Sequence, residues 1–468
     1  MANPNRLSAL DASFLHREDA GPAHLHVASL AVFEGSPPTV EELIDHVVGR
    51  LHLVPRYRQR LAFVPLSQGR PTWADDPFFN ASYHVRSTAL PRPGGDEQLR
   101  RLAGRVLSQP LDRSRPLWEM WLIDRLSEDR FALIGKTHHT VVDGVFGVDI
   151  GTVLFDRDPR GARVSPPLTP WLPEPLPRAA RLLADALVER ATVPGEFMRG
   201  VRAGVRTPLR VAGQLGRPLT SLRPGADGAP NASPLAVEVG PHRRLCWVDA
   251  ELETFKAIKD LLGGTLNDVV LSAVSLALGA WLRSQGHDTG ALALPAMVPV
   301  AVGADPEAAA LGHRVAPVSV LLPVYESEAE RTHRAIVEAM DHANPGRPAL
   351  GAQELTDLED FAPPTILTQV ARLQSRRRAG DLVITNVPGP QQPLYLMGRR
   401  MTRLYPVVPL PPRQALAVSV ISYDGQLGFS LLGDFDALPT LDRLARELEQ
   451  AIDALRLAAG VRRPRRRR

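Results

Sequence analysis

The sequence predicts an α/β fold made of two lobes that face each other, joined by a long and partly helical crossover. Two observations carry this expectation. Segments with strand and helix periodicity alternate in residues 1–155 and again in residues 243–460. Between them, in residues 156–242, proline and arginine become frequent and the helical stretches are short. We therefore expect an N-terminal lobe, a crossover, a C-terminal lobe and a basic, disordered tail at residues 461–468.

The elements of the first half follow from their hydrophobic spacing. Residues 24–33 alternate as a strand does, whereas residues 39–55 have helical spacing and open with a Thr39–Glu42 capping box. Further along, the spacing predicts a helix at 97–111, strands at 117–126 and 130–138, and a helix at 143–155.

The second half predicts a similar alternation after two short crossover helices. The expected elements are helices at 178–190 and 196–206, a strand at 244–249, helices at 250–262 and 268–284, strands at 292–302, 314–324, 380–387, 415–423 and 426–434, and a helix at 440–459.

Composition bounds the class of protein. A chain of 468 residues, 44% of them hydrophobic, can bury a large core. Its one cysteine, Cys246, excludes an intramolecular disulfide framework and a cysteine-based metal cluster, and favours a reducing compartment. No signal peptide opens the chain, and the longest uncharged apolar run, residues 269–282, is shorter than the roughly 20 residues that span a bilayer. We expect a cytoplasmic protein without a transmembrane helix, not secreted, and peripherally associated with a membrane or lipid body.

Positive charge is concentrated in two segments of an otherwise acidic chain. The formal net charge is +4, yet residues 461–468 alone hold six arginines, and residues 175–223 hold nine arginines against three acidic residues. Each segment has two open interpretations: a solvated tail or linker, or a surface that contacts anionic lipid. No aromatic residue interleaves with the tail arginines and no nucleic-acid motif accompanies them, so we expect no nucleic acid partner.

The stretch KTHHTVVDGVFG, residues 136–147, ends an apolar run with two adjacent imidazoles. Consecutive side chains of a strand point to opposite sides, so one of His138 and His139 can face a cleft while the other supports it. A neutral imidazole is the commonest general base at cytoplasmic pH. Asp143 can orient the turn by pairing with a cation, and Gly144 removes a side chain where a ligand can run close. The spacing alone also fits a structural histidine pair, which is the more common case.

Other chemistries lack the residues they need. His139 and Asp143 are four residues apart, but no third ligand of obvious type is nearby, so we expect no metal. The sequence has neither a G-x-S-x-G nucleophile elbow nor a G-x-x-x-x-G-K-[ST] phosphate loop, so serine hydrolysis and nucleotide hydrolysis have no support.

Taken with other blocks, the H-H-x-x-x-D-G pattern resembles the bacterial wax ester synthase/diacylglycerol acyltransferase family. This family belongs to the acyl-CoA-dependent acyltransferase superfamily, with chloramphenicol acetyltransferase and peptide-synthetase condensation domains. At LGHRV, residues 311–315, the sequence departs from the family, because His313 stands where an asparagine is expected. The matching blocks, in order, are LSALDASFLHRE (7–18), RPLWEMWLIDRL (115–126), TLNDVVLSAV (265–274), AMVPVAV (296–302), VITNVPGP (383–390) and SYDGQLGFSLLGD (422–434).

The resemblance implies two chloramphenicol acetyltransferase-like lobes with an active-site tunnel between them. It implies an O-acyltransferase that uses acyl-CoA as co-substrate, needs no cofactor, and esterifies diacylglycerol, a long-chain alcohol or both. His139 would be the general base, and no covalent intermediate is needed because the thioester is already activated. His138 and Asp143 would support it, and Asn267 is a candidate oxyanion donor.

The remaining residues implied by the resemblance are substrate contacts, and each also has an ordinary structural interpretation. Asn267 with Asp268 fits helix capping, residues 116–118 fit a strand start with a core tryptophan, and NVPGP fits a strand and turn. The implied substrate contacts are Glu18, Pro116, Leu117, Trp118, Asp268, Asn386, Pro388 and Gly389.

Two other functions stay open. One is an acyltransferase of the same fold that takes its acyl group from a carrier protein and passes it to another hydroxyl or an amine. The other is a catalytically silent protein of lipid-body surfaces, against which the intact His138, His139, Asp143 and Asn267 argue.

Overall fold

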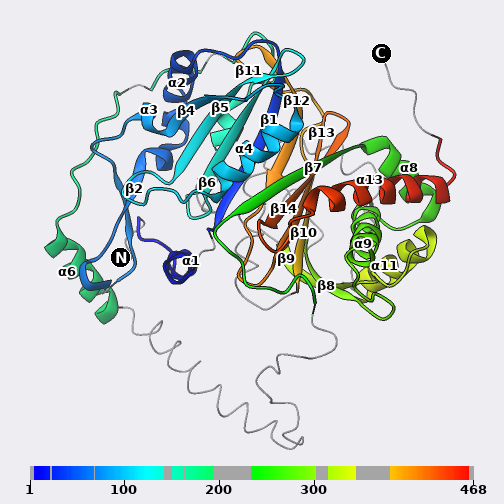
Figure 1. Cartoon of the computed structure of the whole chain (residues 1–468). Coiled ribbons are helices and arrows are strands. Elements are labelled where there is room, and N and C mark those ends of the chain that lie inside the picture. The colour runs from blue at the N-terminus through cyan, green and yellow to red at the C-terminus, as the bar shows by residue number, and fades with distance from the viewer. Residues whose placement is uncertain are drawn as a thin grey trace, which may run out of the picture.

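The computed structural model describes residues 5–21, 24–67, 69–141, 150–162, 164–167, 169–192, 233–301, 315–343 and 380–462 of the chain. Two six-stranded sheets, each accompanied by its own helices, form two lobes side by side (Figure 1). The α/β class and the arrangement in two lobes are therefore as predicted.

The first sheet has the strand order β11-β12-β1-β6-β5-β4. Its strands β1, β5 and β6 lie where the hydrophobic pattern predicted them, and antiparallel pairing of β1 with β6 puts His26 opposite His138. The strands are β1 (His26–Glu34), β4 (Val85–Ala89), β5 (Trp118–Leu126), β6 (Arg130–His138), β11 (Tyr395–Leu396) and β12 (Arg399–Val407).

Strands β11 and β12 come from the C-terminal half of the chain, yet they complete the first sheet. β12 pairs antiparallel with β1, with Val407 opposite Ala28 and Met401 opposite Phe33. Hydrophobic spacing did not predict this strand. It shows no alternation because the second half of β12 is buried on both faces, with β13 and β14 of the second sheet packed against it.

Helices and a small hairpin surround the first sheet. The predicted Thr39–Glu42 capping box is present, but the helix it opens ends at Val48, where Gly49 and a short 3₁₀ turn follow. Of the helix predicted at 143–155, residues 143–149 lie outside the described residues. These elements are α1 (Ala9–Ala20), α2 (Val40–Val48), α3 (Ala81–His84), α4 (Asp96–Ser108), α5 (Ile150–Leu154), α6 (Ala179–Thr192), η1 (Leu51–Leu53), η2 (Pro55–Arg58), η3 (Pro65–Ser67), β2 (Gln59–Ala62) and β3 (Thr72–Asp75).

The second sheet has the order β7-β14-β13-β10-β8-β9, and its helices cover the face turned away from the first lobe (Figure 1). Every strand predicted for this half is present. The strands are β7 (Arg243–Glu251), β8 (Leu294–Ala301), β9 (Val315–Leu322), β10 (Leu382–Val387), β13 (Leu416–Tyr423) and β14 (Gln426–Asp434). The helices are α8 (Leu252–Leu262), α9 (Leu266–Ser284), α11 (Ala329–Ala343) and α13 (Leu441–Ala458).

Helix α9 is the only helix of the described residues that is long and apolar enough to cross a bilayer. It packs against α8, α11 and α13, and 83% of its most apolar window is buried inside the protein. These contacts identify it as a core helix, so the described residues contain no clear transmembrane span.

The start of α9 corrects one prediction. The N-cap is Thr265 rather than Asn267, and Asp268 completes a capping box with it. The Asp268 carboxylate accepts a hydrogen bond of 2.7 Å from the Thr265 backbone N–H. The Thr-x-x-Asp sequence thus forms the capping box that Thr-x-x-Glu more commonly forms. Asn267 is the second residue of the helix.

The two lobes meet along β12. This strand packs on β13 and β14, and the approach is so close that a Cβ on Gly428 would lie 2.3 Å from the carbonyl oxygen of Leu404. Tyr405 stacks on Trp247 with ring centroids 5.1 Å apart and donates a 2.7 Å hydrogen bond to Asp249. Helix α4 adds a second contact by packing against β7.

Candidate active site

The two adjacent histidines lie at the carboxyl end of β6, where neighbouring backbones hold them on both sides. The N–H of His138 donates to the carbonyl of Leu117 at 2.9 Å, and the N–H of His139 donates to the carbonyl of Leu25 at 3.3 Å. The chain then turns, with the Val141 N–H on the carbonyl of His138 at 2.9 Å. Both imidazoles are buried.

The ring of His139 is oriented by the segment that leads into β1. Its Nδ1 atom lies 3.0 Å from the carbonyl oxygen of Leu25, and the edge of Phe14 packs on the ring at a centroid distance of 4.2 Å. A carbonyl oxygen only accepts hydrogen bonds, so Nδ1 carries the proton and the lone pair of the neutral ring lies on Nε2. His139 therefore has the tautomer that a general base acting through Nε2 requires.

The ring of His138 has the opposite tautomer. Its Nδ1 atom lies 2.7 Å from the Thr140 hydroxyl and accepts the Thr140 backbone N–H at 3.3 Å. Its Nε2 atom faces the Oε1 atom of Glu18 at 3.2 Å. Since Nδ1 accepts, Nε2 carries the proton and points it at the carboxylate.

Glu18 is held in turn by Arg113, whose Nη2 atom lies 2.8 Å from Oε2, and by the Leu25 N–H at 2.5 Å from Oε1. Burial by itself raises the pKa of this carboxyl. The nearby charge and hydrogen bond of His138, the charge of His26 and the Leu25 N–H outweigh burial and hold the pKa well below its usual range. Glu18 is thus an ionised, buried support of His138, a contact that the sequence did not indicate.

A second buried ion pair lies two residues before the histidines. The ammonium of Lys136 contacts the Glu119 carboxylate and donates at 2.9 Å each to two carbonyls at the carboxyl end of α4, those of Val106 and of the C-cap residue Gln109. Arg86 reaches the other carboxylate oxygen of Glu119 at 3.5 Å. Lys136 thereby joins the carboxyl end of α4 to β6. A positive charge at the carboxyl end of a helix is favourable because of the helix dipole.

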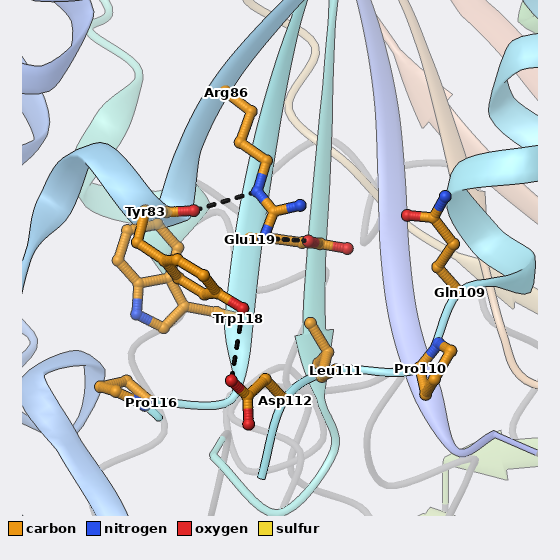
Figure 2. A pocket seen from close by; sticks show the side chains of 9 residues that line it. All are labelled: Tyr83, Arg86, Gln109, Pro110, Leu111, Asp112, Pro116, Trp118 and Glu119. Atoms are coloured by element: carbon orange, nitrogen blue, oxygen red, sulfur yellow. Dashed lines mark hydrogen bonds and ion pairs between the residues drawn. The ribbon is translucent and has the colours of Figure 1, made fainter. Parts of the chain in front are cut away.

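A pocket of about 290 Å³ opens beside this ion pair. Figure 2 shows the Arg86 guanidinium between Tyr83 and Glu119, with Asp112 below them at the Tyr83 hydroxyl. The other lining residues are Gln109, Pro110, Leu111, Pro116 and Trp118.

The three residues 116–118 fall partly in this pocket and partly in the core. Pro116 and Trp118 line the pocket, whereas Leu117 is fully buried in the core of the first lobe and contributes its carbonyl to His138. The Trp118 indole donates to the carbonyl of Tyr57 at 2.7 Å and stacks on His84 at 4.6 Å. These residues therefore lie beside the histidines along the sheet.

The NVPGP segment runs from the end of β10 in the second sheet. Gly389 packs on the end of β13, where its N–H donates to the Ser422 hydroxyl at 3.1 Å and a Cβ would lie 2.2 Å from the carbonyl oxygen of Ser422. Tyr423, the last residue of β13, donates to the carbonyl of Met401, whose partner on β1 is Phe33, at the opposite end of that strand from His26. Asn386 and Pro388 belong to this segment and are half-buried.

The remaining predicted site residues divide into two groups. Asn267 and Asp268 begin α9, in the helix layer on the far face of the second sheet, and Asp268 is engaged in capping. Asp143, Gly144 and His313 lie outside the described residues. Within the described part of the chain, no group of three or more histidine, cysteine or acidic side chains has the arrangement of a metal site.

Comparison with known proteins identifies the family. Residues 7–270 match the model of the wax ester synthase/diacylglycerol acyltransferase catalytic domain, and residues 311–456 match the model of the C-terminal domain of the same enzymes. The chain belongs to the wax ester synthase/diacylglycerol acyltransferase family. The resemblance inferred from the six sequence blocks is thereby confirmed.

Two curated proteins similar to this chain come from Mycobacterium tuberculosis H37Rv. The protein named probable diacylglycerol O-acyltransferase tgs1 is 30% identical over 460 residues, which cover 96% of both chains. The one named probable diacylglycerol O-acyltransferase tgs2 is 31% identical over 457 residues, 93% of this chain and 96% of that one.

Solved structures agree with the family assignment. The wax ester synthase/diacylglycerol acyltransferase of Marinobacter aquaeolei VT8 superposes with a TM-score of 0.68 at 25% identity, covering 97% of this chain and 100% of that one. The first condensation domain of the calcium-dependent antibiotic synthetase superposes with a TM-score of 0.53 at 16% identity, over 97% of this chain and 95% of that one. The latter likeness shows the fold alone, which is the two-lobe α/β fold expected from the sequence.

Proposed function

We propose that this protein is an acyl-CoA-dependent O-acyltransferase that forms neutral lipid, with diacylglycerol or a long-chain alcohol as the acceptor. The observation that carries the proposal is the tautomer of His139, whose Nδ1 atom lies 3.0 Å from a backbone carbonyl and whose basic nitrogen is therefore Nε2. The names of the family and of the mycobacterial relatives give the reaction class and the acceptors.

In the proposed reaction, His139 Nε2 takes the proton of the acceptor hydroxyl while the hydroxyl oxygen attacks the thioester carbonyl. An alcohol does not ionise by itself at neutral pH, so deprotonation and attack are concerted. The carbon–sulfur bond then breaks, the proton passes from His139 to the leaving thiolate, and the products are an ester and free CoA. The thioester is already activated, so the sequence of steps uses neither a covalent enzyme intermediate nor a cofactor.

His138 supports this base without touching the substrate. The Glu18 carboxylate and Thr140 fix its ring, and the two adjacent imidazoles lie with their centroids 4.5 Å apart. Asp143, which follows His139 by four residues in the sequence, belongs to the same proposal as a structural residue. Asn267, expected as an oxyanion donor, begins a helix on the far face of the second sheet, and the proposed mechanism does not use it.

The acceptors reside in lipid, so the proposal includes peripheral attachment to an anionic membrane or a lipid-body surface, with substrates reaching His139 through a tunnel between the lobes. The carrier-protein and silent-protein alternatives gain no support from the mycobacterial relatives, whose names specify diacylglycerol O-acyltransferases.

Measuring thiol release from palmitoyl-CoA with diolein, with hexadecanol and without acceptor tests the proposal. We expect acceptor-dependent release with at least one of the two lipids, and none from a His139→Ala variant. Release that is independent of any acceptor, or absent with both lipids, would contradict it.

A further inference from the structure

Exposed apolar side chains are carried by elements of the first lobe, two of which, β2 and α6, lie on its side away from the second lobe (Figure 1). They belong to the β2–β3 hairpin, to the turn directly after β3, which holds Phe78, and to the segment 171–192, which ends in α6. The most exposed are Leu66, Phe78 and Leu172, at 84%, 82% and 81%. We call the full set the hairpin strip: Phe63, Leu66, Phe78, Leu172 and Val188.

The hairpin strip is mounted on a fixed support. Leu182 and Ala186 of α6 pack against Val64 in a small core of their own. At the other end of the hairpin, Trp171 lies under the Arg58 guanidinium at 4.5 Å, and the Glu174 N–H donates to Asp75 at 3.2 Å. The exposed side chains therefore project from an ordered unit instead of covering one another.

Leu66 is held at a conformational cost. Its φ of 56° and ψ of 21° lie in the left-handed region, which a leucine rarely adopts. The Leu66 side chain is exposed, so it adds little apolar burial to the folded state. The strained backbone of this residue is therefore not offset by packing of its side chain. Such strain is concentrated at sites with a function.

The charges around the strip favour an anionic surface. Arg178, directly before α6, and Arg181, in its first turn, are exposed, and Arg58 stacked on Trp171 forms the arginine–aromatic pair that suits a membrane interface.

We propose that the hairpin strip inserts into the surface of an anionic lipid bilayer and docks the protein there. The proposal rests on the proposed function, because a lipid acceptor must reach the enzyme from such a surface. Protruding apolar tips flanked by arginines gain from burial among lipid chains and from the attraction of anionic headgroups. Apolar insertion persists at high salt, whereas attachment by charge alone does not.

The test uses the full chain and a Leu66→Asp/Phe78→Asp variant, with Leu261→Asp/Leu457→Asp as matched control. The control leucines lie in the second lobe and are 63% and 67% exposed. An aspartate tolerates the left-handed backbone of residue 66 better than leucine does. Binding is measured by sedimentation with vesicles of phosphatidylcholine plus phosphatidylglycerol, and of phosphatidylcholine alone, at low and high salt.

We expect the hairpin variant to bind the anionic vesicles about tenfold more weakly at high salt, while the control binds like wild type. Turnover with a short, water-soluble alcohol should be unchanged in both. Wild-type binding by the hairpin variant, or an equal loss in the control, would overturn the proposal. Analytical ultracentrifugation adds a third outcome: if the hairpin changes abolish self-association but not vesicle binding, the strip joins two copies of the chain, and lipid docking is wrong.

The two proposals fail separately. If no acceptor supports thiol release but the hairpin variant alone loses vesicle binding, the proposed reaction is wrong and the docking surface stands. If transfer to diolein is measured and vesicle binding survives the hairpin changes, the reverse holds.

Discussion

The Oε1 atom of Glu18 lies 3.2 Å from the Nε2 atom of His138, and this contact joins α1 to the end of the strand that carries both histidines. We expect Glu18→Gln, which keeps the shape but removes the charge, to lower turnover about 100-fold by displacing the histidine pair. The KM for palmitoyl-CoA should change little. The matched control is Asp19→Asn, which also pairs with Arg113 but is exposed, and which should behave like wild type. Equal kinetic constants for Glu18→Gln and wild type would rule out this support role.

His139→Ala should abolish acyl transfer while the protein stays folded, because the variant loses the proposed base. General base catalysis contributes about 10²- to 10⁴-fold, and thiol release with thermal melting measures both effects. His138→Ala should cost less turnover and more stability, since it leaves the buried Glu18 without its imidazole. A His139→Ala protein with near-wild-type turnover would refute the mechanism.

Acid should destabilise the fold in two stages. Burial lowers the pKa of His26 well below 6.5, so the folded protein binds fewer protons than the unfolded chain as the pH falls below 6.5, and stability is lost there. Burial lowers the pKa of His84 in the same sense. The pKa of Glu18 lies below its ordinary value of 4.5, so its contribution is complete above that pH and is lost below it. Urea unfolding over a pH series should show His26→Gln flattening the first stage and Glu18→Gln the second. Unaltered pH profiles in both variants would contradict this account.

Lys136→Met should destabilise the protein by about 3 kcal/mol, because it leaves the buried carboxylate of Glu119 with only Arg86 at 3.5 Å. Adding Glu119→Met in the same chain should recover part of this loss, since no unpaired buried charge then remains. Urea titrations of both single variants and the double variant give the coupling free energy. Strictly additive losses would show that the pair is not coupled.

Gly428→Ala should destabilise the protein by about 1–3 kcal/mol, because its Cβ would overlap the carbonyl oxygen of Leu404 where the lobes meet. Gly135→Ala is the control: it is also a strand glycine, but its nearest neighbour is the Ser29 hydroxyl at 3.6 Å. Calorimetry or thermal melting should separate the two. A Gly428→Ala protein as stable as Gly135→Ala would mean that the lobes can move apart at no cost.

The local elements of the fold could be predicted wherever hydrophobic spacing is regular, as in β1, β6 and the Thr39-capped helix α2. Strand β12 could not, because a strand buried on both faces and rich in arginine at its start has no alternation. The N-cap of α9 was misplaced because Thr265 and Asp268 form a capping box with aspartate in the position that usually holds glutamate.

For the site, the sequence located the histidine pair but not the contacts that orient it. Leu25 and Leu117 act through backbone carbonyls, which no side-chain pattern reveals. Arg113 is separated from Glu18 by 95 residues, and a long-range ion pair of this kind has no spacing signature. Gly389 of the NVPGP segment, by contrast, packs so closely on the carbonyl oxygen of Ser422 that a Cβ would overlap it. This packing by itself requires a glycine at that position.

Because β12 pairs with β1, the first sheet cannot be completed until β12 has been synthesised. Translation produces β1 early, but its partner is made only after more than 360 further residues. At 5–20 residues per second, the edge of β1 waits roughly 20 to 70 seconds for this partner. Until then an unpaired, largely buried strand edge is open to other chains. A fragment that stops before residue 399 should therefore aggregate, and nascent chains of this protein are expected to depend on chaperones until β12 has left the ribosome.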